Sequence, residues 1–217
     1  MSPCALKICG VTRVDDVMAC RAAGVRAVGL NFWTGSRRHV TLEQARLLVQ
    51  ACRSPGPHDP VDVVGVFVER SPDEVREVAD ALDLDALQPH GDQPGEAFAD
   101  LGRPWVWVVR GTPALEELAV PESGPAWALL DALVPGYGGE GTRTDWAWAA
   151  RAVRALAPLP VWLAGGIDPE NAASAIAQVR PSGLDVASGA ERSGIRPIAK
   201  DHGRIASLAS ICHNTPQ

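Results

Sequence analysis

The sequence predicts an α/β protein built as a (β/α)8 barrel, and two observations support this prediction. Apolar runs of strand length alternate with amphipathic stretches of helix length, and the 217 residues hold eight such runs. Strands that alternate with helices run parallel and are covered by helices on both faces. Eight such units in roughly 200 to 250 residues are typical of a closed barrel. An open, doubly wound sheet has the same alternation, so the count alone leaves that architecture open.

The eight predicted strands share one pattern, in which a short apolar run ends at a polar or small residue. They are Leu6–Cys9, Ala27–Phe32, Val61–Val68, Ala86–His90, Trp105–Val109, Ala126–Asp131, Val161–Ala164 and Leu184–Ser188. Burial on both faces explains continuous apolar runs such as DVVGVFV at 62–68. In a barrel and in an open sheet alike, ligands bind at the carboxyl ends of the strands. The functional site is therefore expected among the residues at those ends.

Capping signals mark the starts of several predicted helices. Thr12 and Thr41 each precede an amphipathic stretch and are predicted N-caps. Ser71 is a predicted N-cap with Pro72 at the first helical position and acidic residues in the first turn. The stretch DPENAASAIAQV, which begins at Asp168, repeats that signature. Strict alternation of strand and helix is expected throughout.

No low-complexity segment or linker interrupts the pattern, so residues 1–212 are predicted to form one domain, followed by a tail at 213–217. The segment RSPGPHDP at 53–60 is a proline-rich connection inside that domain. Trp146 and Trp148 follow the sixth strand and are predicted to pack in the core, with an interface as the alternative. Both a monomer and a homodimer are compatible with the sequence.

Composition and charge argue against several classes of protein. An apolar fraction of 46% and a charged fraction of 21% are typical of a globular protein. A net charge of -6 argues against a nucleic-acid binder, and no run reaches the length of a membrane span. Charged residues within positions 1–20 argue against a signal peptide. Five widely spaced cysteines without a CxxC pair indicate free thiols, so we expect a cytoplasmic protein without nucleic-acid or membrane partners.

Glycines follow the last two predicted strands, in VWLAGGID (161–168) and LDVASGAE (184–191). Glycine lets backbone amides approach a ligand closely, and barrels often bind phosphate after strands seven and eight. One such turn alone would merely end a strand, but two adjacent turns favour a phosphate site. The candidate residues there are Gly165, Gly166, Ser188 and Gly189.

A further glycine cluster, GYGGEG at 136–141, formally matches the dinucleotide-binding pattern. That interpretation is rejected, because the next predicted strand ends in WLAGG and offers no acid to anchor a ribose. The P-loop interpretation fails as well, since Thr142 and Arg143 stand in place of the required Lys-Ser/Thr. The cluster is predicted to be a mobile loop over the barrel mouth.

Cys9 and Asp131 end the first and sixth predicted strands, so both are expected to face the mouth of a barrel. A thiol has a reference pKa of about 8.5, so Cys9 needs nearby positive charge to act as a base near neutral pH. Lys7 shares the face of Cys9, and closing the barrel would bring Asp185 beside it. The predicted Lys7–Asp185 pair has neutralisation of buried charge as its simpler function. Taken singly, Cys9 is typical of a small core residue and Asp131 of a helix cap.

Two further strand ends offer polar side chains. Arg37 and Arg38 follow the second strand, where an arginine fork suits a carboxylate or phosphate and a solvated basic loop is the alternative. Gln88 and His90 share one face of the fourth strand and are expected to point to the mouth. No His, Cys or Asp spacing is typical of a metal site.

Several motifs match one known family. They are LKICGVTRVDD for K-I-C-G-[LIV]-[TR], VGLNFWTGSRRHV for G-x-x-F-x-x-x-S-P-R-x-V, VGVFVERSPDEV for V-G-V-F-V-N, LDALQPHGD for L-D-x-V-Q-L-H-G-D, LLDA, GGEGTRTDW for G-G-T-G-x-x-F-D-W, LAGGIDPENAASAI, GLDVASGAE, and KDHGRI for K-D-x-x-K-I. With these motifs nearly the whole chain resembles the phosphoribosylanthranilate isomerase family of tryptophan biosynthesis.

The resemblance implies an aldose–ketose isomerase that catalyses an Amadori rearrangement of N-(5-phosphoribosyl)anthranilate to 1-(2-carboxyphenylamino)-1-deoxyribulose 5-phosphate. By resemblance, Asp131 would protonate the furanose oxygen, and Cys9 as a thiolate would remove the C2 proton of the Schiff base. Arg38 would pair with the anthranilate carboxylate. The other implied substrate-binding residues are Lys7, Gln88, His90, Gly165, Gly166, Asp185, Ser188 and Gly189. The implied partner is a phosphorylated small molecule, with no metal or organic cofactor.

The sequence departs from the family pattern at a few positions. Arg37 replaces a proline, Glu140 and Thr144 replace threonine and phenylalanine, and Ala187 replaces a serine. The acid and the base are retained, so the departures bear on the amine portion of the substrate. The same chemistry on another phosphoribosylated arylamine is one alternative. A catalytically silent phosphate-binding barrel is another, and sugar-phosphate epimerisation is a more remote one.

Overall fold

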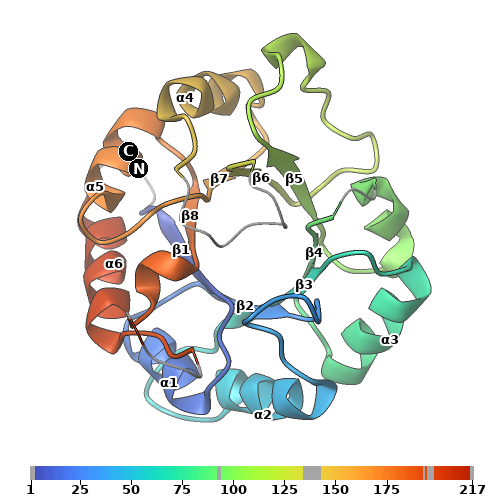
Figure 1. The fold of residues 1–217 in the computed structure, drawn as a ribbon, viewed down its shortest axis with the longest axis vertical. Helices are drawn as coiled ribbons and strands as arrows, with labels where there is room; N and C mark the ends of the chain where they lie inside the picture. Colours follow the sequence, from blue (N-terminus) through green and yellow to red (C-terminus); the bar gives the residue numbers. More distant parts are fainter. Residues whose placement is uncertain (1–2, 92–93, 134–142, 193, 195–197, 216–217) are drawn as a thin grey trace.

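The computed structural model describes residues 3–91, 94–133, 143–192, 194 and 198–215. It contains eight parallel strands arranged as a ring, which confirms the predicted barrel (Figure 1). The strands are β1 Ala5–Cys9, β2 Ala27–Asn31, β3 Asp62–Phe67, β4 Ala86–Pro89, β5 Val106–Arg110, β6 Trp127–Asp131, β7 Val161–Leu163 and β8 Gly183–Val186. Each strand begins within one residue of a predicted apolar run and ends within two residues of it, because two-sided burial leaves a continuous apolar signal.

The strand order β4-β3-β2-β1-β8-β7-β6-β5 distinguishes the barrel from an open sheet. β1 pairs with both β2 and β8, so the first and last strands of the chain are neighbours. The ring closes between β4 and β5 through a parallel bridge from Leu87 to Trp105. The Leu87 backbone N–H also donates to the Pro104 carbonyl at 2.9 Å. This contact between β4 and β5 has the fewest paired residues of any neighbouring strands in the ring. It closes the barrel, which the number of strands alone could not establish.

Six α-helices in the described part of the chain surround the ring (Figure 1). They are α1 Val14–Ala22, α2 Leu42–Arg53, α3 Pro72–Leu82, α4 Trp146–Ala155, α5 Ala172–Val179 and α6 His202–Asn214. In their described residues, the connections after β4 and β5 hold the 3-10 helices η1 (Gly95–Leu101) and η2 (Leu115–Glu117) and no α-helix. The expected strict alternation is wrong at these two connections. Proline and glycine are frequent there, and both residues oppose a continuous α-helix.

The caps follow the prediction in part. Thr41 and Ser71 each form a capping box, with hydroxyls that accept from the third helical N–H of α2 and α3. The prediction for Thr12 is wrong, because α1 is preceded by Arg13 without a side-chain cap. The Thr12 hydroxyl donates instead to the Ile198 carbonyl at 3.1 Å. α5 starts at Ala172, four residues after Asp168, whose carboxylate accepts from the Asn171 N–H at 3.0 Å.

The main apolar core lies between the strands and the helices, as expected for a barrel. Trp146 and Trp148 belong to it and are 9% and 5% exposed, which confirms their predicted core position. Inside the ring, Trp127 and Trp162 stack with ring centroids 5.4 Å apart. α6 extends two residues past Cys212, and the Cys4 N–H donates to the Cys212 carbonyl at 3.2 Å. None of the helices in the described residues has the length and apolar character needed to cross a membrane.

Candidate active site

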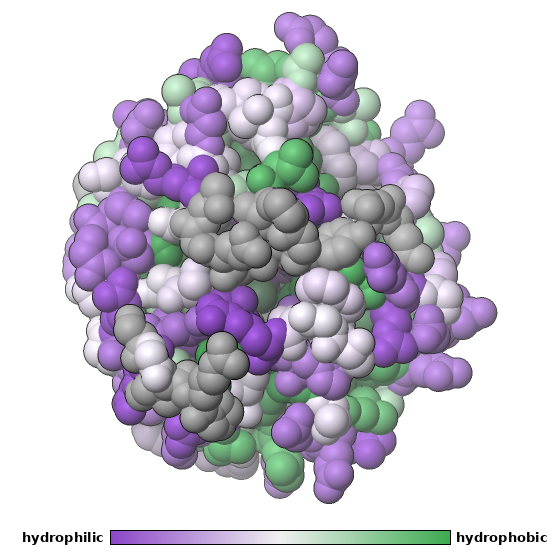
Figure 2. Space-filling model, viewed as in Figure 1, coloured by the Kyte–Doolittle hydropathy of each residue, from purple (hydrophilic) through white to green (hydrophobic). Residues whose placement is uncertain are grey.

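Strand register sets which side chains share the interior of the ring. Lys7 lies opposite Asp185 across the β1–β8 pair, and Arg110 lies opposite Asp131 across the β5–β6 pair. Because side chains alternate along a strand, Cys9 lies on the same face as Lys7, two residues nearer the carboxyl end of β1. Figure 2 shows the same face of the molecule, where hydrophilic and hydrophobic residues are mixed around the centre.

Lys7 is the central polar residue of the barrel interior and is only 1% exposed. Its ammonium group donates to Asp185 Oδ2 at 2.7 Å and to Gln88 Oε1 at 2.8 Å. The structure therefore contains the predicted Lys7–Asp185 pair. Burial alone would lower the pKa of Lys7, but the Asp185 carboxylate and the Cys9 thiolate oppose it and the pKa is raised. Lys7 is thus a cation that orients two neighbours.

A chain of hydrogen bonds continues from Lys7 to the carboxyl group at the end of β6. Gln88 Nε2 lies 2.9 Å from His90 Nδ1, and His90 Nε2 lies 3.2 Å from Asp131 Oδ2. An ammonium group can only donate, so the Gln88 amide atom that contacts Lys7 must be the oxygen. The NH₂ group of the same amide therefore faces His90. His90 Nδ1 must then accept, which places the imidazole proton on Nε2. The Nε2–H group donates to Asp131.

Asp131 receives a second hydrogen bond, from the Ala132 N–H to Oδ1 at 2.9 Å. Its side chain is 13% exposed, so it meets solvent at the mouth while its two oxygens are held in place. The alternative of a helix cap is wrong, because the next helix, α4, is capped by the carboxylate of Asp145. Asp131 is therefore a held carboxyl group at a strand end, with N–H donors on both oxygens.

Cys9 is half-buried, whereas the four other cysteines are buried. It faces Gly29 on β2, where a Cβ atom would come within 2.8 Å of Cys9 Sγ and 3.2 Å of Lys7 Cε. Burial raises the pKa of the Cys9 thiol, and Asp185 adds to the rise. Lys7, Lys200 and Arg38 act in the opposite direction, since their positive charges favour the thiolate.

Arg38 is buried with 6% of its surface exposed, which argues against the alternative of a solvated basic loop. Its aliphatic stem packs across Gly10, where a Cβ atom would collide with Arg38 Cδ and where φ is +70°. Only glycine allows both the close approach and this backbone conformation. Arg38 Nε donates to Glu191 Oε1 at 2.5 Å.

Sequence reasoning did not single out two further residues as functional, namely the buried Lys200 and Glu191, whose side chain is 8% exposed. Glu191 also accepts from Arg37 at 2.8 Å, and Lys200 Nζ lies 3.3 Å from it. Burial raises the pKa of Glu191, but the Arg38 hydrogen bond and the nearby positive charges outweigh it and the pKa is lowered. Both residues lie in family-like motifs, SGAE and KDHGRI, yet no spacing in the sequence links them to Arg38.

The two glycine turns after β7 and β8 pack directly on each other. A Cβ atom at Gly189 would collide with the Ile167 carbonyl, and Gly165 and Gly166 have φ of +86° and +64°. Asn171 Nδ2 donates to the Gly166 carbonyl at 2.8 Å. The predicted phosphate residues, with Ser188 at the start of η3 (Ser188–Ala190), are thus brought together.

Thr144 and Ala187, two of the departures from the family pattern, lie next to these turns. The Thr144 hydroxyl donates to the Ala164 carbonyl at 2.9 Å, next to the first turn. Lys200 Nζ donates to the Ala187 carbonyl at 2.9 Å, next to the second. The GYGGEG loop, including Glu140, lies outside the described residues.

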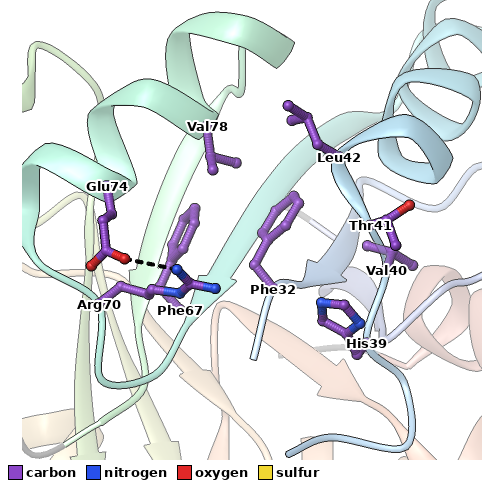
Figure 3. A pocket seen from close by; sticks show the side chains of 9 residues that line it. All are labelled: Phe32, His39, Val40, Thr41, Leu42, Phe67, Arg70, Glu74 and Val78. Atoms are coloured by element: carbon purple, nitrogen blue, oxygen red, sulfur yellow. Dashed lines mark hydrogen bonds and ion pairs between the residues drawn. The ribbon is translucent and has the colours of Figure 1, made fainter. Parts of the chain in front are cut away.

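Within the described ranges, no group of three or more His, Cys, Asp or Glu residues is arranged to hold a metal ion. A hollow of about 150 Å³ lies between the segments that follow β2 and β3 (Figure 3). It is lined by the stacked rings of Phe32 and Phe67 and by the paired Arg70 and Glu74, and it contains none of the predicted site residues.

Fold and site together are those of a (β/α)8-barrel enzyme that carries a thiol and a carboxyl group at the mouth of one barrel. The family model for N-(5'-phosphoribosyl)anthranilate (PRA) isomerase matches residues 6–208. The N-(5'-phosphoribosyl)anthranilate isomerase of Thiobacillus denitrificans is 42% identical over 209 residues, which cover 94% of this chain and 96% of that protein. The chain belongs to this isomerase family.

Solved structures agree with this assignment. Monomers derived from the dimeric phosphoribosylanthranilate isomerase of Thermotoga maritima superpose with a TM-score of 0.77, at 28% identity and with 96% and 98% of the two chains covered. A phosphoribosylanthranilate isomerase in complex with reduced 1-(o-carboxyphenylamino)-1-deoxyribulose 5-phosphate superposes with a TM-score of 0.76, at 28% identity and with 96% and 98% covered.

Proposed function

We propose that Cys9 and Asp131 are the general base and the general acid with which this isomerase converts N-(5-phosphoribosyl)anthranilate to 1-(2-carboxyphenylamino)-1-deoxyribulose 5-phosphate in tryptophan biosynthesis. One observation carries the proposal. The hydrogen-bonded chain Lys7–Gln88–His90–Asp131 joins the carboxyl group to the lysine that lies beside the thiol. A base and an acid are thereby held at one mouth, as a rearrangement on a single sugar requires.

In the first step the Asp131 carboxyl group gives a proton to the furanose oxygen. The ring opens, and the nitrogen lone pair forms the Schiff base at C1. The N–H groups of His90 and Ala132 stabilise the Asp131 carboxylate that remains after the proton transfer.

Cys9 as a thiolate then removes the proton from C2 of the Schiff base. The electron pair of that C–H bond moves toward the iminium nitrogen, which gives an enolamine. Transfer of the C2 hydroxyl proton to C1 gives the ketose, and return of the proton on Cys9 to Asp131 through solvent restores both residues. Lys7, Lys200 and Arg38 favour the thiolate form that this step needs. The rigid end of β1 holds the sulfur while leaving it half-exposed to the substrate.

The two ends of the substrate match the remaining parts of the mouth. The phosphate is proposed to bind the paired glycine turns at Gly165, Gly166, Ser188 and Gly189. The anthranilate carboxylate is proposed to bind Arg38, whose guanidinium group suits a planar anion. Lys7, Gln88, His90 and Asp185 then line the space between these ends. No step requires a metal ion or an organic cofactor.

A fluorescence assay that follows the loss of phosphoribosylanthranilate tests the proposal. Cys9→Ala and Asp131→Asn are each expected to lower kcat by about 10²- to 10⁴-fold, the usual contribution of one proton-transfer group. Cys52→Ala and Asp62→Asn are matched controls, because they remove a buried thiol in α2 and a surface carboxylate on β3. Unchanged turnover in Cys9→Ala or in Asp131→Asn would refute the proposed role of that residue.

A further inference from the structure

Glu191 makes an unusual number of polar contacts for a single buried carboxylate. Oε1 accepts from Arg38 Nε at 2.5 Å and lies 3.3 Å from Lys200 Nζ, while Oε2 accepts from Arg37 at 2.8 Å. The side chains of Glu191, Arg38 and Lys200 are 8%, 7% and 1% exposed, whereas that of Arg37 is 59% exposed. Solvent and salt therefore screen the contacts of Glu191 with Arg38 and Lys200 far less than they screen a surface salt bridge.

Glu191 stands on well-anchored backbone. It follows η3 directly and forms an antiparallel bridge with Lys200. The Arg192 N–H donates to the Ala199 carbonyl at 3.1 Å, and the Asp201 N–H to the Ala190 carbonyl at 2.8 Å. These bonds join the segment after β8 to the start of α6, so the carboxylate has a defined position relative to the barrel.

Arg38, in contrast, lies in the loop after β2 and reaches the mouth through a long aliphatic stem. Its position depends on the packing across Gly10 and on the bond from Nε to Glu191. A guanidinium group is planar, so a strong contact at Nε sets the direction of the whole plane. Binding costs less when such a group is ordered before the ligand arrives.

We propose that Glu191 is a positioning residue, which holds the Arg38 guanidinium group in the orientation that binds the substrate carboxylate, and that Arg37 holds Glu191 in turn. The inference rests on the proposed contact between Arg38 and that carboxylate. Two guanidinium groups face one carboxylate here, so the cluster keeps an excess of positive charge and favours a second anion. Arg37, which stands where the family has proline, adds that second guanidinium group.

Glu191→Gln tests the proposal, because it removes the charge and keeps the shape of the side chain. Charged hydrogen bonds of this kind correspond to about 10- to 100-fold in binding, so KM for phosphoribosylanthranilate is expected to rise by that factor. The value of kcat at saturation is expected to change by no more than about threefold, since the acid and the base are untouched. With a phosphoribosylated aniline, which lacks the carboxylate, KM is expected to be the same in the wild type and in the variant.

Glu74→Gln is the matched control, because Glu74 is also an arginine-paired glutamate, bonded to Arg70 at 2.8 Å on the surface. Its KM is expected to equal that of the wild type for both substrates. Glu191→Asp keeps the negative charge but shortens the side chain, which moves the carboxylate away from Arg38. A KM between those of the wild type and Glu191→Gln is expected. If Glu191→Gln does not fold, as judged by circular dichroism, Glu191→Asp and Arg37→Gln take its place, each with a smaller rise in KM for the carboxylate substrate alone.

An equal rise in KM for both substrates would overturn the proposal, since it would assign Glu191 a general structural role. A lower KM for phosphoribosylanthranilate in Glu191→Gln would overturn it too, because Glu191 would then compete with the substrate for Arg38. Arg38→Gln separates this inference from the proposed function. If Arg38→Gln leaves KM for phosphoribosylanthranilate unchanged, the proposed contact between Arg38 and the carboxylate is wrong. If Arg38→Gln raises that KM and Glu191→Gln does not, the contact stands and only the role of Glu191 is refuted.

Discussion

The two sides of the barrel mouth hold their reactive groups in different ways. On the β1–β8 side, Cys9 faces a set of charged side chains, namely Lys7, Asp185, Lys200 and Arg38. On the β4–β6 side, Asp131 is held by neutral N–H donors from His90 and from the backbone. The difference suits the chemistry. A base must become an anion before the substrate reacts and needs positive charge around it, whereas an acid must begin uncharged and needs donors that stabilise it afterwards.

Within the described residues, Lys7 and Gln88 join the two sides. Lys7 contacts the charged side through Asp185 and the neutral side through the Gln88 carbonyl oxygen. A variant that breaks this link is expected to disturb both sides, and variants further along either side should disturb one. The expected effects below run from the largest to the smallest on that basis.

Lys7→Met should have the largest effect. It leaves the buried Asp185 carboxylate without its ion pair and removes the donor that orients Gln88. Breaking a buried pair typically costs about 3–5 kcal/mol, so the free energy of unfolding in urea is expected to fall by that amount, and kcat by about 100-fold or more. Arg26→Met is the matched control, because its 2.7 Å pair with Asp62 is exposed and worth about 1 kcal/mol or less.

Gln88→Leu should disturb the neutral side while Lys7 keeps its ion pair with Asp185. The His90 imidazole then loses the donor at Nδ1 that holds its proton on Nε2. A loss of about tenfold in kcat is expected, because the Asp131 carboxylate loses part of its stabilisation. Nitrogen-15 NMR of the imidazoles, with His90→Asn to assign the signal, should show the Nε2–H tautomer in the wild type. A wild-type signal from the Nδ1–H tautomer would contradict the chain of hydrogen bonds.

The pH dependence of kcat/KM should report the charged side. Burial raises the pKa of the Cys9 thiol, so the thiolate fraction, and with it kcat/KM, should increase with pH through the neutral range. In Lys200→Met one of the positive charges that lower the pKa of Cys9 is lost, and the ascending limb should move to higher pH. The rate of Cys9 alkylation by iodoacetamide should move in parallel. A shift to lower pH would show that Lys200 does not favour the thiolate.

Thr144→Val should have the smallest effect. The valine keeps the shape of the side chain but loses the hydroxyl that donates to the Ala164 carbonyl beside the first glycine turn. One lost hydrogen bond to a buried carbonyl costs about 1–3 kcal/mol, which lowers Tm by roughly 2–10 °C in a domain of this size. Values of kcat close to the wild type are expected, since neither side of the mouth is touched. A loss of activity without a change in Tm would give Thr144 a direct role that these contacts do not predict.

Much of the barrel could be read from local patterns. The eight strands were predictable because a strand buried on both faces must be apolar along its length, as in residues 62–68. Thr41 and Ser71 were predictable as caps because a capping box lies within four consecutive residues. Thr12 was not, because its hydroxyl bonds to Ile198, which is distant in the sequence. Where the structure describes them, the proline- and glycine-rich connections after β4 and β5 form 3-10 helices, and apolar periodicity alone did not show this.

The sequence by itself determined the alternation of elements, the residues at the strand ends and the Lys7–Asp185 pair, since strand period and barrel closure follow from short-range rules. Only the tertiary structure decided how the polar side chains are connected. The tautomer of His90 depends on a lysine 81 residues away from Gln88, and the bond from Arg38 to Glu191 spans 153 residues. Hydrogen bonds and ion pairs act over a few ångströms in space, so their partners are set by how the loops meet at the mouth.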